Sequence, residues 1–136
     1  MKKIYLSLLM IAVSLSASAQ FGVSYHDSNN SFLGLNYTYN NKLLSEFRLG
    51  SSVADEDAYF EVIATYIIRS SSSFDLYLGV GIASGSEPSQ RGGVIPAGLN
   101  IYPFESKTFG FHTELAYLVV DSGGIRGSWG IRYRFL

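Results

Sequence analysis

The sequence contains no cysteine and only 3 prolines among its 136 residues. Neither disulfide bonds nor thiol chemistry can therefore contribute to this protein. Charged residues make up 15% of the chain, well below the roughly 25% that is usual in soluble domains. The 10 basic and 11 acidic residues nearly balance, and such a balance gives no reason to expect a nucleic-acid partner.

Long hydrophobic runs are also scarce, and the one example lies at the N-terminus. Residues 4–15 are mostly apolar, follow Lys2 and Lys3, and precede the small residues Ala17-Ser18-Ala19. This order is typical of a cleavable Sec-type signal peptide, whereas a transmembrane helix would need about 20 apolar residues. We therefore expect a signal peptide at residues 1–19 and one mature domain at residues 20–136.

The rest of the chain shows a period-two alternation of large apolar residues with small or polar ones. Leu33 and Leu35, for example, alternate with Gly34 and Asn36. Pro96 interrupts one such segment and predicts a bulge or a local bend there. Eight strands of roughly ten residues suit a small transmembrane barrel. The predicted strands are 21–26, 32–39, 42–51, 59–69, 74–83, 93–102, 108–120 and 125–136.

The connections between these strands alternate in length. The first, third, fifth and seventh connections (27–31, 52–58, 84–92 and 121–124) are longer on average than the second, fourth and sixth (40–41, 70–73 and 103–107). Outer-membrane barrels have short periplasmic turns and longer outer loops. This pattern predicts that the first set faces the outside and that both ends of the barrel domain lie in the periplasm.

The two faces of the strands favour a membrane barrel over a secreted soluble β-protein, which would also alternate. The apolar faces are nearly free of charge, and the polar faces hold few charges among glycine, serine, threonine and asparagine, as a narrow barrel interior requires. Aromatic residues at the strand ends predict girdles at both lipid interfaces. The periplasmic girdle would contain Tyr37, Tyr39, Tyr66, Phe74, Phe104, Phe109, Tyr133 and Phe135, and the outer one Tyr25, Tyr59, Phe60 and Tyr117.

The signal peptide, the eight segments and the closing strand resemble the small eight-stranded outer-membrane β-barrel proteins of the OmpA/OmpX type, over residues 20–136. The resemblance implies an all-β, antiparallel up-and-down transmembrane barrel, exported by the Sec pathway to the cell outer membrane. It also implies a monomer in contact with outer-membrane lipid and lipopolysaccharide. In this family the assembly machinery of the outer membrane reads the last strand, here through Trp129, Ile131, Tyr133 and Phe135, which Leu136 follows.

Nine titratable side chains fall on the polar faces and are predicted to meet inside the barrel. Buried charges without partners are very costly, so we expect the four carboxylates to pair with the four arginines, to which they can bind in a bidentate manner. The network would plug the lumen and leave the protein a structural or surface-interaction role; a narrow channel or small-molecule transport barrel is the alternative. The nine residues are Glu46, Arg48, Glu61, Asp75, His112, Glu114, Arg126, Arg132 and Arg134.

Two further patterns could carry chemistry, but neither is strong. His112 and Glu114 could serve a lipid A-modifying hydrolase, but Ser128, the serine predicted nearby, faces inward and not the lipid edge, so we do not expect an enzyme. The acidic run at residues 55–57 could hold Ca²⁺ but lacks EF-hand spacing, and charge runs are usually solvated. We predict no cofactor and no resident metal, although Mg²⁺ or Ca²⁺ could bridge the acidic outer loops to lipopolysaccharide.

Overall fold

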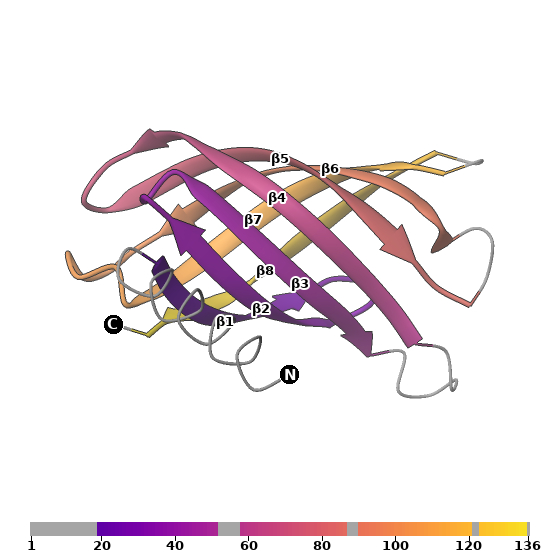
Figure 1. Cartoon of the computed structure of the whole chain (residues 1–136), viewed down its shortest axis with the longest axis horizontal. Helices are drawn as coiled ribbons and strands as arrows, with labels where there is room; N and C mark the ends of the chain where they lie inside the picture. Colours follow the sequence, from indigo (N-terminus) through magenta and orange to yellow (C-terminus); the bar gives the residue numbers. More distant parts are fainter. Residues whose placement is uncertain (1–18, 52–57, 87–89, 121–122, 136) are drawn as a thin grey trace, which may run out of the picture.

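The protein is a closed barrel of eight antiparallel strands in which each strand pairs with the next and β8 pairs with β1 (Figure 1). The computed structural model describes residues 19–51, 58–86, 90–120 and 123–135. The up-and-down topology confirms the predicted fold, and the strand bounds agree with the prediction to within two residues. The strands are β1 (Ala19–Asp27), β2 (Phe32–Tyr39), β3 (Leu43–Ser51), β4 (Ala58–Ser70), β5 (Phe74–Ser84), β6 (Gly92–Ile101), β7 (Phe109–Val119) and β8 (Gly124–Arg134).

The barrel has two distinct ends. The connections after β1, β3, β5 and β7 lie at one end, which we call the loop end, and those after β2, β4 and β6 lie at the other, the turn end, where β1 begins and β8 stops (Figure 1). The predicted signal peptide lies outside the described residues except for Ala19, the first residue of β1.

The connections at the turn end are only partly as short as the sequence pattern predicts. Asn40 and Asn41 have positive φ values of 50° and 54°, which are the values of a type I′ hairpin turn. The amide of Lys42 donates to the carbonyl of Tyr39 at 3.1 Å and closes this turn. The third turn-end connection, 102–108, is as long as the loop-end connection 85–91, so length alone separates the two ends weakly.

Of the two features predicted at Pro96, a bulge or a local bend, the bulge is wrong. The register between β5 and β6 is the same on both sides of Pro96, although paired residues are missing between Val94 and Ala97. Proline has no amide hydrogen to donate, so the ladder is interrupted there without a shift. The register shift lies instead in β4, between Ile67 and Arg69.

Burial alternates along every strand, but in the opposite sense to a soluble protein. Leu33 and Leu35 are each 64% exposed on the outside, whereas Arg48 and Glu61 are 1% and 0% exposed on the inside. Away from the strand ends, the described outward positions include only Ser45 and Thr113 as polar residues. The closed ladder leaves no unpaired strand edge. This combination of apolar outside, polar inside and closed backbone is what a hydrocarbon environment requires.

Aromatic side chains gather at both rims of the exterior. At the turn end, Phe21 packs edge-on against Tyr37, with ring centroids 5.0 Å apart. At the loop end Tyr25, Phe60 and Tyr117 are exposed. Tyr59 was expected in this girdle but faces the lumen and is 9% exposed, because its neighbour Phe60 takes the outward position. No helix in the described part of the chain is long and apolar enough to cross a membrane.

Candidate functional site in the lumen

The nine predicted titratable residues all face the lumen and are buried or half-buried. The structure brings six of them directly together in what we call the central network: Glu46, Arg48, Glu61, Glu114, Arg126 and Arg132. Three carboxylates face three guanidinium groups, so the formal charge of these six groups sums to zero. Such matching offsets the cost of removing each charge from water.

Arg48 is the centre of this network. Its Nη1 and Nη2 donate to the two carboxylate oxygens of Glu114 at 2.7 and 2.8 Å, which is the bidentate arrangement that arginine favours. Nη2 also donates to Glu46 at 3.0 Å and Nη1 to Glu61 at 3.4 Å. The hydroxyl of Tyr77 donates to Glu114 at 2.8 Å. Arg48 thus ties β3, β4 and β7 together across the lumen.

Glu61 forms the loop-end part of the network. Both Nη atoms of Arg126 donate to its carboxylate, Nη2 at 3.0 Å. The hydroxyl of Tyr59 donates to the same group at 2.8 Å, and the Arg126 guanidinium lies over the Phe32 ring, 4.7 Å from its centroid. Arg48, Arg126 and Tyr59 together provide four hydrogen bonds to this one carboxylate.

Glu46 holds the turn-end side of the network and includes a residue that sequence reasoning missed. Arg132 Nη2 donates to Glu46 at 3.2 Å, and its Nη1 donates to Asn100 at 2.8 Å. His26 Nε2 lies 2.9 Å from Glu46, and His26 is fully buried. His26 has the same parity in its strand as the inward-facing Ser24, and this alternation was the signal that could have identified it.

Asp75 and Arg134 do not join the central network, contrary to the prediction of one connected set. Asp75 binds Lys107 Nζ at 2.6 Å and accepts from Ser70 at 2.6 Å, at the turn end. No described carboxylate lies within ion-pair distance of Arg134, whose Nη2 donates to the Tyr102 hydroxyl at 3.4 Å. Burial raises the pKa of Tyr102 to about 12, so this hydroxyl stays protonated at neutral pH. The charges therefore form two groups. Asp75 and Arg134 are separate from the central network because they lie at the start of β5 and the end of β8, both at the turn end.

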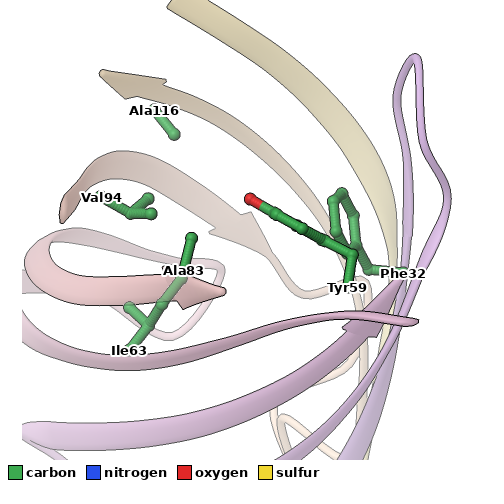
Figure 2. Close-up of a cluster of buried hydrophobic side chains, with 6 residues drawn as sticks. All are labelled: Phe32, Tyr59, Ile63, Ala83, Val94 and Ala116. Carbon is green, nitrogen blue, oxygen red and sulfur yellow. The ribbon is translucent and has the colours of Figure 1, made fainter. Parts of the chain in front are cut away.

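An apolar cluster lies in the loop-end half of the lumen. Tyr59 and Phe32 lie side by side with ring centroids 5.5 Å apart, and Figure 2 shows them facing smaller side chains from β4 to β7. The cluster consists of Phe32, Tyr59, Ile63, Ala83, Val94 and Ala116. Ion pairs and apolar packing together therefore close the lumen.

The lumen shows no hydrolase arrangement among its described residues. His112 has His26 as its hydrogen-bond partner, at 2.8 Å, and not a serine. Ser128 is buried on β8 opposite Glu114 and faces inward, away from lipid. No cluster of three or more potential metal ligands occurs among the described residues. The acidic run 55–57 lies outside the described residues.

The predicted assembly residues form the outer face of the closing strand. Trp129 is 62% exposed, and Ile131, Tyr133 and Phe135 are between 42% and 50% exposed. Tyr133 and Phe135 pack edge-on at 5.2 Å at the turn end. This row therefore lies on the exterior of β8, next to the seam with β1.

Searches by sequence match neither a known protein family nor a curated protein. Solved structures do match. The N-terminal β-barrel domain of OprF from Pseudomonas aeruginosa superposes with a TM-score of 0.62 at 16% identity and covers 87% of this chain and 97% of that one. The de novo designed protein TMB2.3 matches with a TM-score of 0.65 at 13% identity, covering 88% and 94%.

A third match is the outer membrane protein Ail of Yersinia pestis in a phospholipid bilayer nanodisc. Its TM-score is 0.54 at 19% identity, and the match covers 87% of this chain and 99% of that one. At these identities the likeness concerns the fold, and it extends over nearly the whole of each structure. The chain therefore has the fold of the small eight-stranded outer-membrane β-barrels.

Proposed function

We propose that this protein is an integral outer-membrane barrel with a sealed lumen that serves the cell envelope as a structural or surface-contact element. The observation that supports this most strongly is the inverted distribution of polarity. Arg48, Glu46 and Glu114 are at most 2% exposed inside the barrel, while Leu33 and Val80 are each 64% exposed outside. A soluble protein with this distribution would be unstable for two reasons. It would expose the apolar area whose burial is its main stabilising term, and it would bury charged groups at a cost.

The proposal includes a monomer in contact with outer-membrane lipid and lipopolysaccharide. Transmembrane barrels need no partner strand, because closure satisfies all strand edges. The turn end would lie in the periplasm, and the loop end outside. The assembly machinery would recognise the row Trp129, Ile131, Tyr133 and Phe135 on the last strand.

Heat-modifiable mobility on gels tests this proposal. The full-length protein expressed in a bacterium with an outer membrane should appear in the outer-membrane fraction and migrate faster unboiled than boiled. Single-channel recordings in planar bilayers should show no steady conductance, since Arg48 and Arg132 are tied to carboxylates across the lumen. Identical mobilities with the protein in the soluble periplasmic fraction would overturn the membrane location. A steady conductance abolished by Arg132→Ala would overturn the sealed lumen and favour a channel.

A further inference from the structure

The loop end of the lumen contains a cavity of about 280 Å³, near the lower end of the size range of small-molecule sites. Phe32, Tyr59 and Ala83 line it from the apolar cluster, and Leu118 and Arg126 line it from β7 and β8. This volume contrasts with the middle of the barrel, where the ion pairs are closely packed. The middle of the barrel is thus filled, and cavities lie toward its ends: this one at the loop end and a second of about 260 Å³ at the turn end, where Asp75 and Lys107 line it.

Arg126, the charged residue that lines the cavity, is already paired with Glu61. Glu61 accepts from Tyr59, Arg48 and both Nη atoms of Arg126. An ionised carboxylate offers about four lone-pair positions, and these four bonds use them. A charged ligand would therefore lose its hydration without gaining a free counter-charge from this pair.

The lining of the cavity is mixed, because the polar residues Asn29, Asn30, Gln90 and Arg126 stand beside the apolar side chains. Leu118 is only partly buried against the apolar cluster, and the Phe32, Tyr59 and Ala83 side chains present the rest of the wall. Asn29 and Asn30, both exposed, stand at the rim. A lining of this kind suits a ligand that combines an apolar part with a hydrogen-bonding group.

We propose that this cavity binds a small uncharged molecule with one apolar ring and one hydrogen-bonding group. The ring would lie against Phe32, Tyr59 and Leu118, and its polar group would point to the rim. The cavity is a dead end, because the central network closes the lumen behind it, so the molecule is bound and not passed through. That the ligand comes from outside the cell rests on the orientation given in the proposed function.

Fluorine NMR of para-fluorobenzyl alcohol, titrated onto the full-length protein in detergent micelles, tests the inference. The wild-type protein should show a saturable change in fluorine signal that unlabelled benzyl alcohol displaces. Partition into micelles is not saturable and is measured with micelles alone. The charged analogues para-fluorobenzoate and para-fluorobenzylamine should bind at least about tenfold more weakly, because desolvating a charge without a new partner is costly.

Two matched substitutions locate the site. Ala83→Leu places extra volume in the cavity and should weaken saturable binding by about tenfold or more, since overpacking is unfavourable. Ala97→Leu adds the same side chain to the exposed outer face of β6 and should leave binding unchanged. Leu118→Phe is a second filling variant if Ala83→Leu does not fold, as judged by heat-modifiable mobility.

Either of two results overturns the inference. The wild-type protein could give only the non-saturable signal of micelles, or Ala83→Leu and Ala97→Leu could give the same saturable signal. The barrel proposal would survive either result, provided that the protein still shows heat-modifiable mobility. If heat-modifiable mobility is absent as well, both proposals fail.

Discussion

His112 Nε2 lies 2.8 Å from His26 Nδ1, although 86 residues separate the two histidines. They belong to β7 and β1, and both are paired with Gly130 of β8, which lies between them. Because Gly130 has no side chain, the two rings can meet across it, with centroids 4.1 Å apart. His26 also reaches Glu46 at 2.9 Å. A chain of hydrogen bonds therefore joins β3, β1 and β7 beside the closing seam.

The order of donors and acceptors in this chain of hydrogen bonds makes the two histidines unequal. An ionised Glu46 can only accept, so a neutral His26 donates from Nε2 and accepts at Nδ1 from His112. The Nδ1 atom of His112 is then a buried acceptor without a partner among the described residues. His26→Leu should destabilise the barrel by about 1–3 kcal/mol, because Glu46 loses a donor in a buried site. His112→Leu should be nearly neutral, since it exchanges one unpaired acceptor for another.

Equilibrium unfolding in urea from lipid vesicles, followed by the fluorescence of Trp129, measures this difference. Trp129 is the one tryptophan in the sequence and is 62% exposed on the outer face, so its emission reports transfer from lipid to water. Equal losses of unfolding free energy in the two variants would contradict the assigned order of donors and acceptors.

Arg48 should be the most sensitive single position in the lumen. Arg48→Met removes the partner that Glu114 binds at 2.7 and 2.8 Å and one partner of Glu46. Breaking a buried pair from one side costs about 3–5 kcal/mol. The double variant Arg48→Met with Glu114→Gln should recover part of this loss, because the uncompensated charge is removed. Arg69→Met is the control, since Arg69 is exposed at the turn end.

The same urea titrations give the coupling between the two positions. We expect the double variant to be more stable than the sum of the single losses predicts, since contacting residues are not additive. If Arg48→Met is no more harmful than Arg69→Met, the charges of the lumen are hydrated and the interior is not sealed.

The alternation of residues predicts most of this barrel and misses what depends on three-dimensional pairing. Period two decides which side chains share a face, so the inward position of Glu46 or Arg134 follows directly from the sequence. The partner of each charge depends on the stagger between strands, which no local pattern contains. For this reason the sequence pattern groups Asp75 with the arginines, although Lys107 binds it. The sequence pattern also predicts Tyr59 in the outer girdle, because aromatic content alone does not distinguish a rim position from a lumen position.

Turn chemistry at the β2–β3 hairpin predicts opposite effects for two substitutions of one residue. Asn41 has a φ of 54°, in the left-handed region, where glycine and asparagine are tolerated and β-branched residues are strongly disfavoured. Asn41→Gly should leave the free energy of unfolding unchanged or slightly raised, since Asn-Gly is the preferred pair for this turn. Asn41→Val should lower it by about 1–2 kcal/mol.

Urea unfolding and the rate of insertion into preformed vesicles measure both effects. Gly itself lowers the unfolding free energy where a negative φ is needed, so a loss in Asn41→Gly together with no loss in Asn41→Val would contradict the left-handed turn. Lys42→Val, next to the turn and exposed, controls for the general effect of a branched residue at this end.

Closure of the barrel should depend on Gly130 more than on any other glycine of β8. A Cβ atom at Gly130 would overlap the carbonyl oxygen of Tyr25 in β1 and approach the ring of His112 to 2.9 Å. At Gly127, on the same strand, the nearest atom to an added Cβ is Leu115 Cδ2 at 3.7 Å. Gly130→Ala must therefore displace the backbone of β1 at the seam, whereas Gly127→Ala meets only ordinary van der Waals contact.

We expect Gly130→Ala to lower the free energy of unfolding by at least about 2 kcal/mol, as overpacking against backbone leaves little room to relax. It should also reduce the fraction of protein with heat-modifiable mobility after refolding, because β8 must pair with β1 to remove the last strand edges. Gly127→Ala should refold like the wild-type protein. Similar refolding yields and stabilities for the two alanine variants would show that the β1–β8 seam can open by the width of a methyl group without loss, which would contradict the tight closure described above.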